Sequence, residues 1–311
     1  MKKILVTLSA LAISTAAASA ADLARKAPPP PPPPILYSWT GFYVGGHLGA
    51  GWARKEWSEP GHAGCDTFVT CDPGATELGL GSHNAMGVLG GFQAGYNYQI
   101  GVVVLGVEGQ FSFADLKGDS QNSFSHTSTT GFFECGFLTA CQLTDQFNSQ
   151  ERLSTSIRDI ATLAGRLGVV SGPQDRTLWY VKGGGAWVRD NYAASIHASD
   201  LSCTNVISIF GNATACDNFN FNSNLFGNSD RWGWMVGTGV EWALIDNWST
   251  KIEYDYLGFN SHNVTMAGFV PTGEGPHAIS RTFNINQNIS IIKIGLNYRF
   301  NWGAAPLVAS Y

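Results

Sequence analysis

Residues 235–259, MVGTGVEWALIDNWSTKIEYDYLGF, decide the fold. They hold two runs in which every second residue is mostly aromatic or β-branched, joined by the turn Ile245-Asp246-Asn247. The apolar face of the two runs comprises Val236, Thr238, Val240, Trp242 and Leu244, then Trp248, Thr250, Ile252, Tyr254 and Tyr256. Glycine and charged residues occupy most of the positions between them. Because successive side chains of a strand point to opposite faces, the stretch predicts a two-faced β-hairpin.

The same period-2 pattern recurs along the chain and predicts an all-β protein. Eight runs carry it: 40–52, 84–99, 103–113, a fourth ending at 169, 177–188, 235–244, 248–257 and 292–300. The connections alternate between short turns and four long segments, 53–83, about 118–155, 189–230 and about 259–287. This alternation predicts eight antiparallel strands with short turns at one end and long loops at the other.

The N-terminal residues indicate export. Lys2 and Lys3 precede an apolar stretch, and Ala18-Ser19-Ala20 supplies small residues for cleavage, so 1–20 is expected to be a signal peptide. Residues 21–38 contain seven consecutive prolines and predict a stiff periplasmic linker. The barrel is expected over 39–300, and 301–311 would form a C-terminal extension.

The composition favours the apolar face meeting lipid. Charged residues make up only 13% of the chain, glycine numbers 37, and the net charge of −5 argues against nucleic acid as a partner. The polar face is rich in glycine, which suits the crowded interior of a small barrel. Aromatic residues gather toward strand ends on the other face, as they do at the two interfaces of a bilayer. The sequence therefore predicts an eight-stranded transmembrane β-barrel with long extracellular loops and short periplasmic turns.

A charge network is expected inside this barrel, since sealed charges must pair. Its predicted members are Glu108, Arg166, Lys182, Arg231, Glu241, Lys251, Glu253, Asp255, Lys293 and Arg299. Asp159 has the parity of the lipid face, and we expect it above the membrane rim or at a bulge.

The chain resembles the small outer-membrane β-barrel proteins of α-proteobacteria, the opacity-like, immunogenic or porin-family proteins. The resemblance rests on ADLARKAPPPPPPP after the signal, WTGFYVGGHLGAGW, GRLGVV, the opening stretch and IIKIGLNYRF. It implies the bacterial outer membrane as location, with lipid and lipopolysaccharide as surroundings. It also implies insertion by the barrel-assembly machinery through a C-terminal signal formed by Lys293, Gly295, Tyr298 and Phe300. Eleven residues follow Phe300 and end on the aromatic Tyr311, so two candidates for the terminal aromatic stay open.

All six cysteines fall in the long segments, two in each of three loops. In an exported chain this predicts three disulfides within loops, Cys65–Cys71, Cys135–Cys141 and Cys203–Cys216. The spacing does not match a zinc site, and no metal is expected.

The residues favour a structural or weakly pore-forming protein whose interior is plugged by the charge network. The alternative is a surface-loop binding module for haem, a host ligand or a matrix ligand. Some relatives bind haem, and His62, His83, His126, His197, His262 and His277 lie in or beside loops. His126 and Ser128 stand two residues apart, but no acid partner is evident in the sequence, and we expect no enzyme.

Overall fold

The computed structural model describes residues 36–60, 77–136, 139–272 and 275–300. The signal peptide, most of the proline-rich linker, the C-terminal extension and the pair Cys65 and Cys71 lie outside the described residues. The strands are β1 (Gly41–Pro60), β2 (Glu77–Ile100), β3 (Val103–Thr129), β4 (Phe133–Gly136), β5 (Thr139–Ser171), β6 (Thr177–Ser208), β7 (Gly211–Ala243), β8 (Trp248–Thr272) and β9 (Gly275–Phe300). A 3₁₀ turn, η1 (Pro173–Asp175), joins β5 to β6. In this part of the chain, no helix has the length and apolarity needed to cross a membrane.

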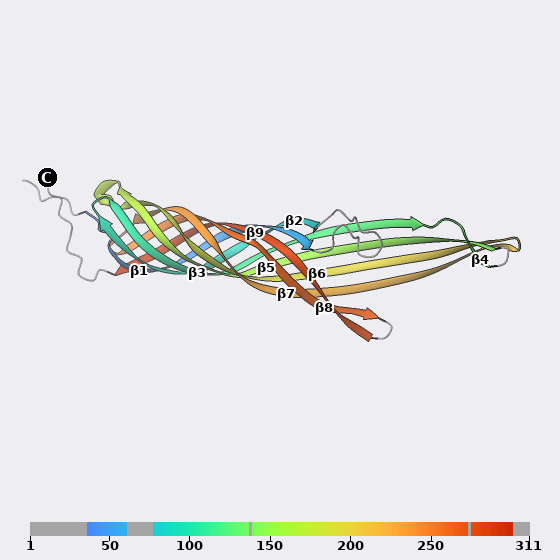
Figure 1. Cartoon of the computed structure of the whole chain (residues 1–311). Coiled ribbons are helices and arrows are strands. Elements are labelled where there is room, and N and C mark those ends of the chain that lie inside the picture. Colours follow the sequence, from blue (N-terminus) through green and yellow to red (C-terminus); the bar gives the residue numbers. More distant parts are fainter. Residues whose placement is uncertain (1–35, 61–76, 137–138, 273–274, 301–311) are drawn as a thin grey trace, which may run out of the picture. The chain divides into compact units, whose positions relative to one another are not determined.

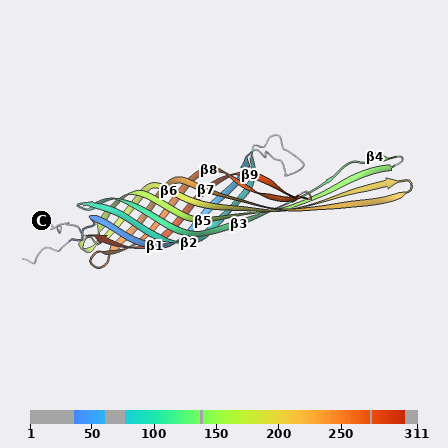
Figure 2. The same cartoon turned by 90° about the horizontal axis from the view of Figure 1, so that it is seen from below.

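All strands belong to one antiparallel sheet, and the sheet closes on itself (Figures 1 and 2). Its order is β3-β2-β1-β9-β8-β7-β6-β5-β4, and β3 also pairs with β5. That pairing joins Val103 to Val169 and continues along both strands, so the long strands form a ring. β4 pairs only with the distal part of β5 and stands outside the ring.

The strands begin and end near the predicted positions at the short turns, but three predicted long loops are instead largely strand. Segments 118–155, 189–230 and 259–287 continue the ladders of β3, β5, β6, β7, β8 and β9. The β6–β7 register is unbroken from Thr177↔Trp242 to Ser208↔Gly211. The pairing of β2 with β3 ends at Met86↔Lys117, whereas the β3–β5 ladder continues to Thr129↔Thr144. A four-stranded sheet of β3, β5, β6 and β7, with β4 beside its distal end, therefore continues beyond the ring.

The outward face of the ring is an apolar band. Leu48 and Val88 are each 69% exposed and Trp232 is 79% exposed, although all three are large and apolar. Past this band the outward side chains change, since Arg54 and Glu56 on β1 are charged and largely exposed. An exposed apolar belt bounded by charge is the surface that a bilayer covers.

A bulge explains the parity of Asp159. The β5–β6 register shifts between Ile157 and Asp159, and the β3–β5 register shifts at Phe113/Leu116. A bulge adds one residue to the strand, so the alternation of inward and outward side chains is reversed beyond it. Ile157 and Ile160, three residues apart, therefore both point inward and are at most 2% exposed. Asp159 itself pairs with Arg189 at 3.4 Å.

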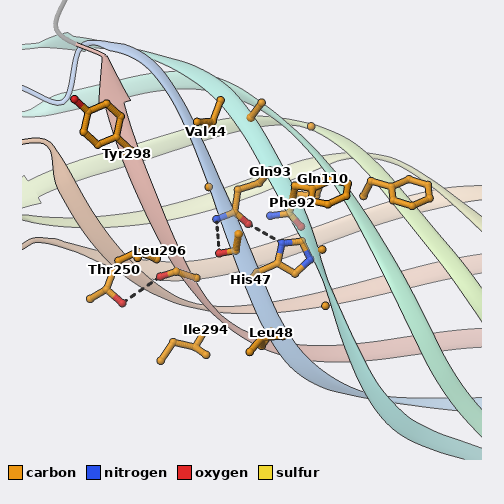
Figure 3. Close-up of a pocket in the computed structure, with 18 of the residues that line it drawn as sticks. Val44, His47, Leu48, Phe92, Gln93, Gln110, Thr250, Ile294, Leu296 and Tyr298 are labelled. Carbon is orange, nitrogen blue, oxygen red and sulfur yellow. Dashed lines mark hydrogen bonds between the residues drawn. The ribbon is translucent and has the colours of Figure 1, made fainter.

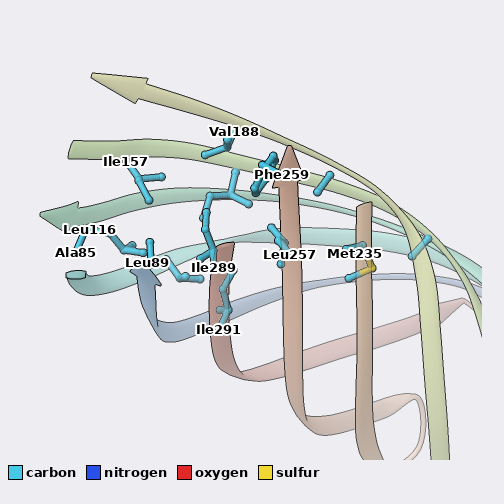
Figure 4. Close-up of a cluster of buried hydrophobic side chains, with 14 residues drawn as sticks. Ala85, Leu89, Leu116, Ile157, Val188, Met235, Leu257, Phe259, Ile289 and Ile291 are labelled. Carbon is cyan, nitrogen blue, oxygen red and sulfur yellow. The ribbon is translucent and has the colours of Figure 1, made fainter. Parts of the chain in front are cut away.

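Three buried apolar clusters divide the interior along the strands. The proximal cluster, nearest the short turns, is Trp39, Val104, Val170, Leu178, Tyr180 and Ala243. The middle cluster includes Leu89, Leu116, Ile157, Val188, Met235, Leu257, Phe259, Ile289 and Ile291 (Figure 4). The distal cluster includes Trp57, Leu153, Tyr192, Leu225, Met266, Phe283 and Ile285. Along β6 these clusters follow one another in sequence, and polar residues occupy the intervals.

The distal hairpins carry two disulfides, in the expected pairing. Cys203 and Cys216 are directly opposite each other on β6 and β7, and Cys135 is joined to Cys141. Each bond links neighbouring strands of the sheet that continues beyond the ring. It therefore stabilises that sheet rather than the barrel.

Replacing both Cys203 and Cys216 by serine is expected to loosen the β6–β7 hairpin locally. A disulfide contributes about 2–4 kcal/mol, so chymotrypsin should cleave near Phe219 at least about tenfold faster in the variant. The barrel's heat-dependent shift on an SDS gel should stay unchanged, because no ring contact is lost. An unchanged cleavage rate would contradict a bracing role.

Candidate functional site: the charged lumen

Eight charged side chains meet inside the ring between the proximal and middle clusters. Four are cations and four are anions: Arg166, Lys182, Lys251, Lys293, Glu108, Glu241, Glu253 and Asp255. Every one of these side chains is at most 4% exposed. They come from β3, β5, β6, β7, β8 and β9, so the group spans the lumen and is neutral in sum.

Glu253 is the most connected member. Its carboxylate lies 2.6 Å from Lys182 Nζ, 3.1 Å from Lys293 Nζ and 3.2 Å from Lys251 Nζ. Tyr180 donates its hydroxyl proton to Glu253 at 2.8 Å, and Gln110 donates an amide proton at 2.9 Å. With three cations and two neutral donors, this carboxylate has replaced its water shell with protein groups.

Glu108 and Asp255 share the same lysines. Glu108 accepts hydrogen bonds from Lys251 at 2.8 Å and from Tyr43 at 2.8 Å. Asp255 lies 2.5 Å from Lys293 Nζ and 3.2 Å from Lys182 Nζ. No member can be removed without leaving a buried charge short of a partner.

Glu241 forms the second half of the network with Arg166. Their closest atoms, Arg166 Nη2 and Glu241 Oε2, are 2.5 Å apart, and the guanidinium carbon lies 3.7 Å from the centre of the Tyr180 ring. Ser249 and Asn297 donate to the other carboxylate oxygen at 2.5 and 2.8 Å. Arginine suits this place because its plane stacks on the ring while its edge meets the carboxylate.

Neutral polar side chains extend the network toward β1 and β2. His47 Nδ1 lies 2.7 Å from Gln93 Oε1 (Figure 3). His47 Nε2 lies 2.8 Å from Ser112 Oγ. Gln93 also donates to Asn297 Oδ1 at 2.7 Å. Because Asn297 donates in turn to Glu241, these hydrogen bonds connect His47 to the charged group. His47 therefore points into the barrel and is 4% exposed.

A groove of about 1300 Å³ lies in the wall formed by the same strands, and its lining includes His47, Gln93 and Gln110 of the lumen side as well as apolar residues of the outer face. Small residues such as Gly46 and Gly90 form part of its lining, and Val44, Leu48, Phe92, Ile294, Leu296 and Tyr298 are among its larger lining side chains (Figure 3). Thr250 at its edge hydrogen-bonds the backbone carbonyl of Gly295 at 3.1 Å, so its hydroxyl is satisfied on an otherwise apolar face. The outward apolar part of this lining suits contact with hydrocarbon.

Two of the ten predicted members lie elsewhere. Arg231 sits further along the barrel, where it donates to Gln287 Oε1 at 3.2 Å and to two backbone carbonyls, of Asn260 and Ile285. Arg299 lies near the short turns with its guanidinium 4.4 Å from the ring of Tyr37. Both side chains are buried, at 4% and 8% exposure, but they belong to other levels of the lumen than the eight-residue group.

The segment before β1 packs against the short-turn end, which the sequence did not indicate. Trp39 is 2% exposed; its indole N–H donates to the carbonyl of Asp175 and its backbone N–H to Gln99. Tyr37 donates its backbone N–H to the carbonyl of Gln174. The linker was expected to extend to residue 38. Tyr37 was therefore assigned to the linker, although it contacts the short-turn end of the barrel.

A second buried ion pair lies beyond the apolar band, between the middle and distal clusters. Lys55 Nζ and Asp190 Oδ1 are 3.0 Å apart and both side chains are 0% exposed. Tyr192 donates to the other carboxylate oxygen at 3.0 Å. Continuing the period-2 pattern of the first run past residue 52 would have placed Lys55 inward, but the segment was assigned to a loop.

A third ion-paired group lies at the level of the distal cluster. Arg281 bonds both Glu59 carboxylate oxygens, at 2.9 and 2.5 Å, and also donates to Glu151 at 3.0 Å. Burial, partly offset by Arg281, raises the pKa of Glu151. Charged and apolar levels thus alternate along the inside of the ring and its continuation.

The free energy of unfolding should depend on pH through Lys55, which lies beyond the apolar band. Burial lowers the pKa of Lys55 to about 8 from an ordinary value near 10.5, although Asp190 opposes the shift. Between about pH 8 and 10 the unfolded chain keeps a proton that the folded chain has lost, so stability rises with pH. The free energy of unfolding should rise by about 2 kcal/mol more in the native protein than in Lys55→Met over this range. Parallel urea-unfolding curves would contradict this assignment.

The histidines suggested as haem ligands lie on different strands. His83 is buried with Nε2 3.0 Å from Thr155 Oγ1, and His197 Nδ1 is 2.6 Å from Asn222 Oδ1. His262 and His277 lie opposite Ile285 and Val270, and His62 falls outside the described residues. Among the described residues, no three His, Cys, Asp or Glu side chains are grouped to hold a metal ion.

The His126–Ser128 pair lies in β3 rather than in a loop. An acid that the sequence did not reveal stands opposite Ser128, namely Asp145 on β5. Its carboxylate accepts a hydrogen bond from Ser202 Oγ at 2.6 Å.

The predicted assembly residues occupy both faces of β9. Lys293 and Gly295 face the lumen, whereas Tyr298 packs against Trp248 and Phe300 on the outer side, with ring centres 5.1 Å apart in each case. Phe300 ends the last described strand and stacks on Phe42 of β1.

Comparison with known proteins identifies the family of this chain. Residues 7–300 match the outer membrane protein β-barrel domain family. The chain is 26% identical over 268 residues to the 31 kDa outer-membrane immunogenic proteins of Brucella melitensis and Brucella suis, covering 85% of each chain. It is also similar to the crystal structure of the outer membrane protein OprG from Pseudomonas aeruginosa, at 11% identity and a TM-score of 0.33, covering 86% of this chain and 100% of that one. The chain belongs to the outer membrane protein β-barrel domain family and is a β-barrel protein of the bacterial outer membrane.

Proposed function

We propose that this protein is a non-conducting, eight-stranded envelope barrel that holds a disulfide-braced β-sheet outside the membrane. The observation that carries the proposal is the neutral group of four cations and four anions, each at most 4% exposed, across the lumen. Hydrated ions entering such a group would have to break charge pairs that have already lost their water.

The apolar clusters add support on both sides of the charges. Trp39 and its neighbours fill the short-turn end, and Leu116, Leu257 and Ile289 of the middle cluster are fully buried. An eight-stranded barrel has an interior just wide enough to be filled by side chains. A plug of alternating charged and apolar levels favours a structural role over a weak pore.

The partners implied by this role are those of the membrane itself. We expect outer-membrane lipid and lipopolysaccharide to cover the apolar band, and the barrel-assembly machinery to engage β9 through Tyr298 and Phe300. No arrangement of reacting groups supports a catalytic role for the lumen, because its carboxylates are held in ion pairs.

A liposome-swelling assay tests the proposal. Liposomes containing the full-length protein, diluted into an isotonic solution of a small sugar, should swell no faster than protein-free liposomes. A general porin in matched liposomes supplies the positive control. Swelling above the protein-free rate would contradict a closed lumen and restore the weak-pore alternative.

A further inference from the structure

The distal end of the sheet exposes a cluster of apolar side chains, here called the distal tip: Phe132, Phe133, Ile207, Ile209 and Phe210. Their exposed fractions are 59%, 43%, 42%, 70% and 88%. Ile209 and Phe210 form the turn between β6 and β7, while Phe133 begins β4. The sheet order β4-β5-β6-β7 brings the two hairpins together, since Phe133 lies opposite Cys141 and Cys141 lies opposite Val206.

The tip is almost free of charge. Residues 201–216 contain no Asp, Glu, Lys or Arg, and neither do residues 139–144; Glu134 is the one charged residue between 130 and 136. A charged side chain is costly to move into hydrocarbon, and this segment has almost none to move. The adjoining ladder has charges again at Asp200 and Asp217, which bounds the uncharged region on its barrel side.

The turn at the tip satisfies part of its own backbone hydrogen bonding. The β6–β7 ladder pairs residues up to Ser208↔Gly211, and the N–H of Phe210 donates to Ser208 Oγ at 3.2 Å. Unsatisfied backbone groups exclude most turns from hydrocarbon, and this turn has a partner for its central N–H. The disulfides Cys203–Cys216 and Cys135–Cys141 hold both hairpins in register just behind the apolar residues.

We propose that the distal tip inserts into the surface of a second, apposed phospholipid bilayer. The strand from Arg189, where β6 leaves the apolar band, to Ile209 has about 20 residues and spans roughly 60 Å at ~3.3 Å per residue, so the tip is carried well away from the membrane that holds the barrel. A convex, uncharged, aromatic turn suits the interfacial region of a bilayer. It lacks the charges that would select a polyanion or a charged protein surface.

The test uses full-length protein in nanodiscs mixed with phosphatidylcholine vesicles whose acyl chains carry bromine. In the variant Phe210→Trp, fluorescence from the added tryptophan should be quenched by the vesicle lipid, while the ten native tryptophans of the unsubstituted protein supply the background. Co-flotation with vesicles should fall at least about tenfold in the double variant Ile209→Asn and Phe210→Asn. Replacing Phe219, an exposed aromatic lower on β7, by asparagine is the matched control and should leave co-flotation unchanged.

Binding should also be insensitive to salt up to about 0.5 M and should need no anionic lipid, because the tip has no charge to screen. The heat-dependent gel shift establishes that each variant retains its barrel. Three outcomes would each overturn the proposal. The first is an absence of quenching, and the second is co-flotation that survives the loss of Ile209 and Phe210. The third is a tip variant that changes only the association between protein copies. These outcomes do not depend on whether the lumen conducts.

Discussion

Replacing Glu253 by glutamine is expected to lower the free energy of unfolding of the barrel by about 3–5 kcal/mol. The substitution keeps the size of the side chain and leaves four buried cations facing three anions. Lys182, Lys251 and Lys293 each lie within 3.2 Å of this carboxylate, so all three lose a partner. Urea unfolding of the protein in phosphatidylcholine vesicles, followed by tryptophan fluorescence, measures the loss.

A second substitution distinguishes charge balance from packing. Adding Lys251→Met to Glu253→Gln restores equal numbers of cations and anions, and it should recover at least about half of the lost stability. Glu56→Gln is the matched surface control, since Glu56 is 54% exposed and pairs with Arg54, and it should change stability by less than about 1 kcal/mol. A Glu253→Gln protein as stable as the native one would show that water reaches this carboxylate.

The second large effect is expected at Asp190. Asparagine at this position would leave the fully buried Lys55 without its counter-ion and should cost about 3 kcal/mol at pH 7. Because burial already lowers the pKa of Lys55 to about 8, the loss should shrink toward pH 10, where the amine is neutral in the folded protein. Unfolding measured at both pH values checks the size and the direction.

Asp230→Asn is the matched control for this substitution. Asp230 pairs with Arg189 at 3.2 Å but is 58% exposed, so its replacement should have little effect at either pH. Equal losses for Asp190→Asn and Asp230→Asn would contradict the view that burial, and not the ion pair itself, sets the magnitude.

The ring could be predicted from the sequence because its two faces meet different media. Inside the apolar band, lipid selects residues such as Leu48 and Val88 for one face, and the crowded lumen selects glycine and paired charge for the other. That contrast produces the period-2 signal, and it located the strand ends at the short turns. All ten interior charges were expected in one network, whereas the structure connects eight of them and places Arg231 and Arg299 at other levels.

The extensions were missed because that contrast disappears outside the membrane. Along segment 118–129 Ser, Asn and Thr occupy both faces of the strand, and no alternation marks it. Segment 211–223 does alternate, with Asn and Thr on one face and mostly Ala and Phe on the other, but it was assigned to a long loop. The middle cluster was missed for a related reason. Leu116 and Ile289 are inward apolar residues in a lumen expected to be polar, and Ile157 is placed inward by a bulge that reverses the face pattern of β5. A bulge adds one residue without a distinctive sequence, so a period-2 reading passes over it.

Single-channel recording across a planar lipid bilayer tests the central claim most directly. With full-length protein inserted, a closed lumen predicts a baseline without reproducible current steps, at most rare picosiemens-scale events, over a range of salt concentrations and voltages. Reproducible nanosiemens steps that grow with salt would mean that Glu108, Glu253 and their lysine partners face open water. The interior would then be an ion path, and the account of a sealed, charge-paired barrel would be wrong.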